Sequence, residues 1–286
     1  MHETTQELTI RAATRSDRLA ICTLLQQAWH SGGTARWDQL DALETGCEAV
    51  LVCRGTQTVG FCLFDLRAAP VARLSAAAIA DREQVGNVWK ELWPASEGHL
   101  RERGIRFVHY IGEAPWLLEA LREHGFQQVN TLISYERTVD GPELPGHPQV
   151  HVRPARAEDL STVEQIDAAA FPLLWRYPRP MLEAALRSNP HLAIAELDRR
   201  PVGYALCTFE GDEGQVVRLA VLPEYRRQAI GSRLLAEALA HLRRGRVRRL
   251  SLNTQGDNVA AHKLYERFGF RRTGDELPVL EKALEG

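Results

Sequence analysis

The sequence predicts a protein of the mixed α+β (α/β) class, built as two tandem domains of the same kind. Three observations predict it: the length of the chain, the order of its strand-like and helix-like segments, and an internal repeat. A chain of 286 residues is long enough for two domains that each bury a core. Strand-like and helix-like segments alternate through both halves, which favours sheets flanked by helices.

The internal repeat relates the two halves at a nearly constant spacing. The matched pairs are Arg11, Ala13 and Asp17 with Arg153, Ala155 and Asp159, then Val59–Phe61 with Val202–Tyr204, and Leu121–Phe126 with Tyr265–Phe270. Because the spacing drifts by only two positions over the three matches, we interpret the chain as a tandem duplication.

A proline- and glycine-rich segment separates the halves. Three prolines and two glycines lie between Asp140 and Pro148, and no helical or strand period crosses them. We therefore expect a first domain over residues 1–139, a linker over 140–149 and a second domain over 150–286.

The composition excludes several classes of protein. A formal charge of −2 argues against a general binder of nucleic acid or of membrane surfaces, since such binders need a basic excess. No uninterrupted apolar run approaches about 20 residues, so we expect no membrane span. The five cysteines form no C-x-x-C pair and are expected to be reduced thiols in a cytoplasmic protein, either a monomer or a homodimer.

The second half shows its predicted elements most clearly. Strands are predicted at residues 151–155, 192–197, 201–209, 215–221, 247–254, 270–274 and 278–284. Helices are predicted at 160–171 and 258–268, and a third follows the loop after residue 221 and ends at about residue 244. Asp159, or Ala157 before it, stands where the first helix is capped, and Gly269 stands where a left-handed cap ends the last helix.

The stretch "YRRQAIGSRLL", which begins at Tyr225, opens a helix directly after a strand. A helix leaves its first four N–H groups unpaired and carries partial positive charge at that end, so an anion can bind there if the side chains are small. Ala229, Gly231 and Ser232 are small, and two preceding arginines add positive charge. Taken alone, such a loop is a weak signal, because some loops of this kind are no more than a helix start.

A second group of residues follows one strand later, in "NTQGDNVAAHKLYERFGF". Asn258, Ala261 or His262, and Tyr265 share one face of the predicted helix. The plain alternative is that Asn258 only caps the helix and that Tyr265 only fills the core.

Together these two groups resemble the GNAT superfamily of N-acetyltransferases over essentially all of residues 150–286. The family's acetyl-CoA loop corresponds to Arg226 through Gly231, with Ala229 at the usual first glycine, and its later motif to Asn258, Ala261, Leu264, Tyr265, Gly269 and Phe270. The resemblance implies that each domain is a mixed, mostly antiparallel twisted sheet with a splayed parallel pair of central strands, flanked by helices. We expect Ala229 to adopt the α region and at most to weaken binding.

The resemblance also implies an acetyl-CoA-dependent N-acetyltransferase in which an amine attacks the thioester directly in a ternary complex. Tyr265 would give a proton to the leaving thiolate, and no metal is expected. The residues implied to hold the coenzyme are Leu219, Ala220, Val221, Arg226, Arg227, Gln228, Ala229, Ile230, Gly231, Ser232, Asn253 and Asn258.

The general base is left open by the sequence. Family members often carry a glutamate at the position of Gln215, which cannot accept a proton. Glu213, two residues earlier, and Glu210 are the alternatives, and a water relay needs neither. A solvated hairpin glutamate is the plain reading of Glu213.

The acceptor is expected to be a small-molecule amine or a peptide N-terminus. Phe171 and Trp175 in "AFPLLWRYP" are similar to the Phe-Pro-x-x-Trp turn of the subgroup that acetylates N-terminal alanines, although a loop packed on the core explains them equally well. Tandem halves with one working site also resemble mycothiol synthases.

The first half lacks the residues of the motif. Asp81, Glu83 and Val85 occupy the loop position, where carboxylates would repel a pyrophosphate, and Leu121 replaces the tyrosine. We therefore expect a degenerate first domain without an acetyl-CoA loop. The alternative for the whole protein is a non-catalytic sensor of acyl-CoA or amines.

Overall fold

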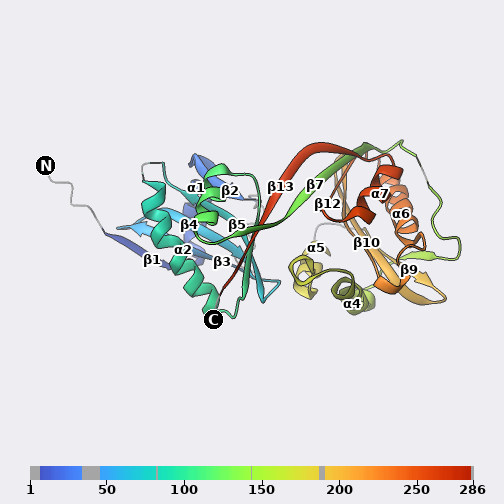
Figure 1. The fold of residues 1–286 in the computed structure, drawn as a ribbon, viewed down its shortest axis with the longest axis horizontal. Coiled ribbons are helices and arrows are strands. Elements are labelled where there is room, and N and C mark those ends of the chain that lie inside the picture. The colour runs from blue at the N-terminus through green and yellow to red at the C-terminus, as the bar shows by residue number, and fades with distance from the viewer. Residues whose placement is uncertain (1–6, 34–45, 82, 143, 187–190, 285–286) are drawn as a thin grey trace. The chain divides into compact units, whose positions relative to one another are not determined.

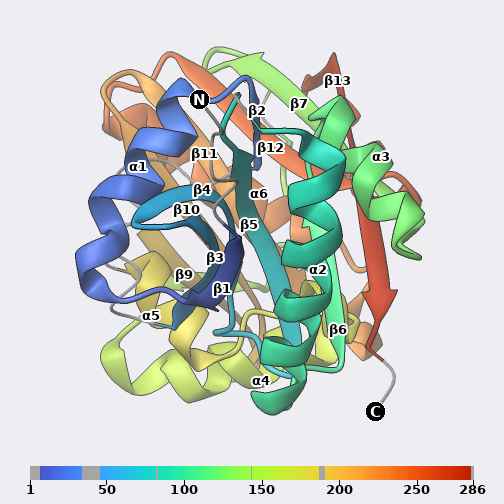
Figure 2. The same cartoon turned by 90° about the vertical axis from the view of Figure 1, so that its left-hand side faces the viewer.

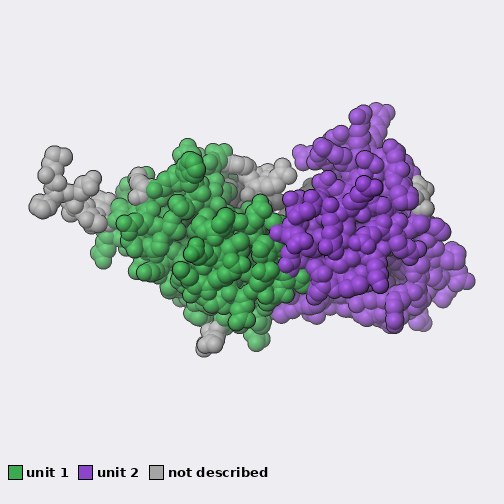
Figure 3. Space-filling model, turned by 45° about the horizontal axis from the view of Figure 1, so that its top comes forward, with its two compact units in different colours: residues 1–130, 277–286 green, residues 131–276 purple. Residues whose placement is uncertain are grey.

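The computed structural model describes residues 7–33, 46–81, 83–142, 144–186 and 191–284. The chain forms two compact units (Figure 3): unit 1 comprises residues 1–130 with 277–286, and unit 2 comprises residues 131–276. This division differs from the expected boundaries, because a segment at the end of each half belongs to the other unit.

Unit 1 contains one sheet with helices on both faces. Its elements are β1 (Leu8–Ala12), η1 (Arg15–Asp17), α1 (Arg18–Gln27), β2 (His30–Gly33), β3 (Cys47–Arg54), β4 (Gln57–Asp65), β5 (Val71–Ile79), α2 (Val85–Glu102), β6 (Phe107–Ile111), α3 (Pro115–Glu123) and the start of β7 (Gln127–Thr138). The strand order is β1-β3-β4-β5-β6-β13. Helix α1 covers one face and α2 covers the other (Figure 2).

Unit 2 repeats this plan. Its elements are β8 (His151–Pro154), η3 (Ala157–Asp159), α4 (Leu160–Ala170), η4 (Leu173–Trp175), α5 (Arg179–Leu186), β9 (His191–Leu197), β10 (Arg200–Glu210), β11 (Glu213–Val221), η5 (Pro223–Tyr225), α6 (Ile230–Arg244), β12 (Arg249–Gln255), α7 (Val259–Arg267) and the start of β13 (Arg271–Ala283). The strand order is β8-β9-β10-β11-β12-β7, with α4 and α5 on one face and α6 and α7 on the other (Figure 1).

Each sheet is antiparallel except for one central pair that splays apart. In unit 2, β11 and β12 pair in parallel from Glu213 to Val216, and beyond that point β11 pairs only with β10 among the described strands. In unit 1, β5 and β6 likewise pair only from Val71 to Arg73. The expected mixed sheet with a splayed parallel pair is therefore confirmed in both units.

The duplicated residues form the same local structure in both halves. Asp17 accepts hydrogen bonds from the Thr14 N–H and from both Arg11 Nη atoms at 2.6 to 2.8 Å. Asp159 accepts the same set from the Arg156 N–H and the Arg153 Nη atoms at 2.7 to 2.9 Å. In each half this carboxylate ties the first strand to the start of the first helix.

The last strand of each half completes the sheet of the other unit. Residues 131–138 of β7 lie in unit 2, where Leu132 to Thr138 pair with β12. Residues 277–283 of β13 lie in unit 1, where Val279 to Ala283 pair with β6. The two short closing strands predicted at 270–274 and 278–284 are thus one strand, and its second part belongs to unit 1.

Candidate functional site

The splayed end of β11 leaves one backbone edge open in unit 2. Leu206 pairs with Arg218 and Cys207 with Val216, so Val217 is bulged out of the register. The next residues, Leu219 to Val221, pair with β10 on one side, and no described strand pairs with their other edge. An extended ligand can add to such an edge through backbone hydrogen bonds.

The open edge leads through η5 into the start of α6. Arg227 and Ala229 have φ of 63° and 58°. Among the described residues, no backbone hydrogen bond is donated by the N–H groups from Gln228 to Ser232. Ile230, Gly231 and Ser232 form the first turn of α6, so these N–H groups are the unpaired donors that an anion needs.

Two expectations about this loop are wrong in detail. Ala229 is in the left-handed region rather than the α region, at a cost of about 1–2 kcal/mol for a residue with a Cβ. The Arg226 guanidinium does not extend toward the loop N–H groups, because it donates to the Ala170 carbonyl at 2.7 Å and to the Val221 carbonyl at 3.3 Å. Arg226 therefore braces the loop, while Arg227 stays exposed.

The expected linker packs on the same turn of α6. The His147 N–H donates to the Ala229 carbonyl at 3.2 Å. A Cβ added to Gly146 would lie 2.2 Å from Arg233 Cα, so no side chain fits there. Arg233 Nε donates to the Val150 carbonyl at 3.5 Å. We call residues 146–150 the strap; the expected linker residue Glu143 lies outside the described residues.

Helix α7 carries the second group of motif residues. Asn258 caps the helix, because its Oδ1 accepts a hydrogen bond from the Ala261 N–H at 3.2 Å. Tyr265 is 6 % exposed and packs against Tyr135 and Phe270 with ring centroids 6.0 and 6.1 Å apart. Capping and core packing are therefore real roles of these residues, alongside any binding role.

The Tyr265 hydroxyl has a distinct environment. It makes no hydrogen bond among the described residues and is not one of the fully buried polar atoms without a partner, so it keeps a contact with solvent. Burial raises the pKa of Tyr265 to about 12. The hydroxyl is thus a proton donor that stays protonated at neutral pH.

A residue from the first half supports α7. The Tyr135 hydroxyl lies 2.8 Å from His262 Nδ1, while His262 Nε2 lies 3.1 Å from the Gly256 carbonyl. Because only a donor can face a carbonyl, Nε2 carries the proton and Nδ1 accepts from Tyr135. Arg272 Nε donates to the same hydroxyl at 3.1 Å. The sequence repeat assigns Tyr135 to the first half, so the sequence alone does not predict its contact with α7.

Glu213 lies far along β11 from the open edge at Leu219–Val221. It is exposed and paired with Arg249 at 2.5 Å, at the end of β11 that is closed by β12. At a rise of ~3.3 Å per residue it lies roughly 20 Å along the strand from Leu219. Glu210 pairs with Glu213 in the same hairpin, and Asn253 is exposed on β12 just past the parallel pairing.

A buried ion pair that sequence reasoning missed lies on the α4 face of β11. Asp167 is 0 % and Arg218 8 % exposed. Arg218 Nε and Nη2 donate to the two Asp167 oxygens at 2.8 and 3.0 Å. The carboxylate also accepts from the Tyr204 hydroxyl at 2.5 Å and from the Tyr177 N–H at 2.6 Å. It is therefore fully hydrogen-bonded, as a buried charge must be.

This pair anchors the loop that holds Phe171 and Trp175. The Arg218 Cζ lies 3.7 Å from the Phe171 ring centroid and 4.1 Å from that of Tyr177. Arg218 Nη2 also donates to the Trp175 carbonyl. An arginine inside the apolar strand "VVRLAV" and an aspartate in "EQIDAAAF" are the sequence signals that could have revealed the pair.

In unit 1 the equivalent edge is covered by the chain itself. Strand β2 pairs with β5 from His30↔Ile79 to Gly33↔Ala76. Gly60 pairs with Ile79 as Gly203 pairs with Val221, so this edge of β5 corresponds to Leu219–Val221. The backbone groups that are open in unit 2 are thus used within unit 1.

Residues at the start of α3 pack against β2. A Cβ added to Gly32 would lie 2.6 Å from Ala114 Cβ, and Trp116 Nε1 donates to the Ser31 carbonyl at 3.2 Å.

The loop of unit 1 is also tied down. Glu83 pairs with Arg54 at 2.7 Å, and Asp81 accepts from the Trp29 N–H at 2.7 Å. The buried Leu121 takes the place of Tyr265.

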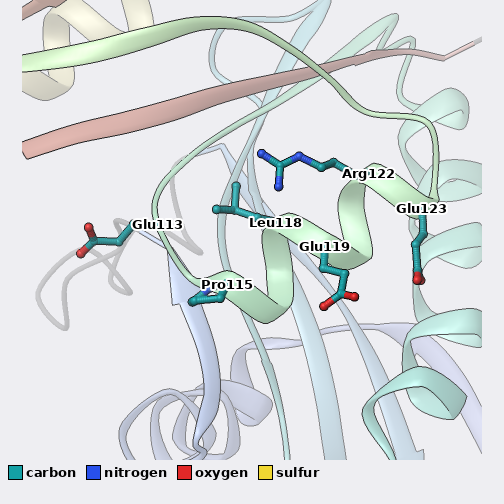
Figure 4. Close-up of a pocket in the computed structure, with 6 residues that line it drawn as sticks. All are labelled: Glu113, Pro115, Leu118, Glu119, Arg122 and Glu123. Atoms are coloured by element: carbon teal, nitrogen blue, oxygen red, sulfur yellow. The ribbon is translucent and has the colours of Figure 1, made fainter.

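The surface of unit 1 has a hollow of about 570 Å³ beside α3 (Figure 4). Its lining residues are Glu113, Pro115, Leu118, Glu119, Arg122 and Glu123. None of them belongs to the sequence-predicted site. Among the described residues, no cluster of His, Cys, Asp and Glu suits a metal ion, and no helix is long and apolar enough to cross a membrane.

Comparison with known proteins agrees with this geometry. Residues 159–270 match the acetyltransferase (GNAT) family. A putative ribosomal protein bS18-alanine N-acetyltransferase from Bacillus subtilis is 33 % identical over 125 residues, which cover 43 % of this chain and 82 % of that protein. The fold and the match define an acyltransferase, and the chain belongs to the GNAT family.

Two further proteins resemble larger parts of the chain. Mycothiol acetyltransferase from Geodermatophilus obscurus is 28 % identical over 186 residues, which cover 56 % of this chain and 58 % of that protein. The solved structure of a tandem GNAT protein from the clavulanic acid biosynthesis pathway has a TM-score of 0.67 at 14 % identity, with 98 % of this chain and 99 % of that chain covered. The second likeness shows the tandem fold.

Proposed function

We propose that the protein is an acetyl-CoA-dependent N-acetyltransferase with its site in unit 2. The observation that carries the proposal is the continuity of the open β11 edge at Leu219–Val221 with the unpaired N–H groups from Gln228 to Ser232. A strand-like arm that ends in a pyrophosphate fits this run of donors and acceptors.

The residues present fit acetyl-CoA, which would supply the acetyl group as a reactive thioester. The backbone of Leu219 to Val221 would bind the pantetheine amides, and the first turn of α6 would bind the pyrophosphate. Arg227, which is exposed at this turn, would add positive charge. The Asn258 Oδ1 is used by the cap, so the amide NH₂ is the part of this side chain that would reach the coenzyme.

Tyr265 would donate the proton that the departing thiolate takes up. Its solvent contact and its pKa of about 12 both suit a neutral donor. Because Glu213 is paired with Arg249 far along β11, we propose that water carries the amine's proton to solvent instead. Orientation of the two substrates would then supply much of the rate enhancement.

The acceptor would be a primary amine, on a small molecule or at a peptide N-terminus, that enters on the α4 face beside Phe171 and Trp175. The name of the Bacillus subtilis relative refers to an alanine of a ribosomal protein, which supports a peptide N-terminus as one class. Five free cysteines support a cytoplasmic location.

Unit 1 would not bind a second coenzyme, because β2 occupies its equivalent edge. Titration calorimetry with acetyl-CoA should therefore give one molecule per chain. Two bound molecules would contradict the assignment of the site to unit 2 alone.

Thiol release with a panel of amines tests the chemistry. Tyr265→Phe should lower kcat by about 10²–10⁴-fold and leave acetyl-CoA affinity unchanged. Tyr110→Phe is the matched control, because its hydroxyl is buried without a partner in unit 1. Equal rates for the two variants would rule out Tyr265 as the proton donor.

A non-catalytic sensor is the second candidate, because Gln215 cannot accept a proton and Glu213 is paired with Arg249. Acetyl-CoA binding without thiol release for any amine would favour the sensor.

A further inference from the structure

We propose that Arg218 helps to select the acceptor. Its Nη1 would donate a hydrogen bond to a carbonyl oxygen next to the acceptor's amine. The preferred acceptors would then be amines that carry an amide or peptide carbonyl. The proposal rests on the proposed function, in which the amine enters on the α4 face.

Arg218 has one nitrogen left over, Nη1, which carries two N–H donors. Its Nε and Nη2 are used by Asp167 and the Trp175 carbonyl. Nη1 makes no hydrogen bond among the described residues. It is also absent from the fully buried polar atoms without a partner, so it reaches solvent although the side chain is only 8 % exposed.

The position of Arg218 suits contact with an acceptor. It follows the bulge at Val217 and directly precedes Leu219, where the open edge of β11 begins. The rings of Phe171 and Tyr177 lie against the guanidinium, which leaves the edge of the group for a ligand. Burial raises the pKa of Tyr265 and the Arg218 charge partly offsets that rise, so the two groups lie within electrostatic range.

The charge balance selects the kind of oxygen that binds. Asp167 already neutralises Arg218, and both are buried. An acceptor carboxylate would add a third charge to this site without a counter-charge, which is unfavourable in a buried place. A carbonyl oxygen needs only a donor, and the free Nη1 supplies it.

The test compares three amines with the full-length protein saturated with coenzyme A. Alaninamide carries the carbonyl, isopropylamine replaces the carboxamide with a methyl group, and alanine carries a carboxylate. NMR titration gives a dissociation constant for each amine. For each variant, the dissociation constant of isopropylamine is divided by that of alaninamide to give a ratio. Comparing this ratio between variants cancels intrinsic differences between the amines.

Arg218→Met combined with Asp167→Asn removes the pair without leaving a buried charge alone. Arg218→Lys keeps the charge and loses the fork of donors, so it serves if the pair variant is unstable. Both should lower the ratio about tenfold, the usual size of a hydrogen bond from a charged donor. Tyr204→Phe, which removes a different bond to Asp167, should keep the ratio of the parent.

A ratio that is unchanged in both Arg218 variants would overturn the proposal, as would tighter binding of alanine than of alaninamide. Thiol release is measured separately on the same variants, with acetyl-CoA in place of coenzyme A and with the whole panel of amines. A ratio that depends on Arg218 without any thiol release supports the carbonyl subsite and refutes the enzyme, so the two proposals fail separately.

Discussion

Ala229 stands at the point where the chain turns into α6, with φ of 58° and ψ of 17°. The resemblance to the GNAT loop implies a glycine there, and glycine adopts this conformation without steric cost. The alanine is held by the His147 N–H and by the first turn of the helix, both of which bind its carbonyl. The strain is therefore local and can be removed by one substitution.

Ala229→Gly should stabilise the protein by about 0.5–1 kcal/mol, because the relief of the left-handed strain exceeds the entropy that glycine adds to the unfolded chain. Urea unfolding measures the change. Ala236→Gly, inside α6, is the control and should destabilise by about 1 kcal/mol. If the two variants lose stability equally, Ala229 is not left-handed.

The raised pKa of Tyr265 predicts a loss of stability at high pH. Between its ordinary pKa of about 10 and its folded value of about 12, the unfolded chain releases the proton and the folded chain keeps it. Stability then falls as pH rises, by up to about 1.4 kcal/mol per pH unit. Unfolding at pH 8 and pH 11 should show a larger decline for the parent than for Tyr265→Phe, and parallel declines would contradict the burial of this phenol.

Some residues of the site can be predicted from the sequence and others cannot. Gly231, Asn258 and Tyr265 sit in motifs whose spacing alone places them on one loop and one helix face. Arg218 is conspicuous as a charge in an apolar strand, but its role could not be assigned, because its partner Asp167 is 51 positions away and meets it only in the folded protein. The φ of Ala229 also depends on tertiary contacts rather than on its own preference.

At the scale of elements, the strap is the segment whose structure the composition predicts wrongly. Its proline and glycine content predicts a plain linker, yet residues 146–150 lie on the first turn of α6. Proline fixes the backbone φ angle, and Gly146 has no side chain to keep the strap away from α6. A proline- and glycine-rich composition is therefore also compatible with a packed segment.

Gly146→Ala should weaken acetyl-CoA binding about fivefold, the effect of one hydrogen bond, because its Cβ would push the strap away from Arg233 and break the His147–Ala229 contact. Calorimetry measures the affinity. Gly98→Ala, on α2 with open space around the new Cβ, should leave it unchanged. A variant at Gly146 that melts earlier but binds normally would give the strap a purely structural role.

The pairing of β13 shows why element prediction stops short of topology. Residues 270–284 have the alternation of strands, and they do form a strand. Nothing in their own composition says that Val279 and Leu280 pair with β6, more than 160 residues earlier in the chain. Only long-range packing fixes that choice.

For the whole molecule, the exchange of last strands makes the folding of each half depend on the other half. Unit 1 buries Val279 and Leu280 from the end of the chain, and unit 2 buries Ile133 and Tyr135 from the first half. Each half alone would lack one strand and the apolar side chains on it.

Fragments 1–143 and 144–286 should therefore be poorly folded alone and should regain structure and acetyl-CoA binding when mixed. Circular dichroism and calorimetry measure the recovery, with an intact chain carrying an uncleaved protease site at position 143 as the control. A second-half fragment that binds acetyl-CoA by itself would show that β7 is dispensable.

The exchange also bears on the order of events during synthesis. Domains commonly fold as they leave the ribosome, the N-terminal one first. Here the sheet of unit 1 lacks residues 277–283 until they leave the ribosome, whereas residues 131–276, including the strand from the first half, leave it earlier. Unit 2 should thus complete its sheet before unit 1 does, and truncation after residue 276 should leave unit 1, which contains the earlier part of the chain, without its last strand.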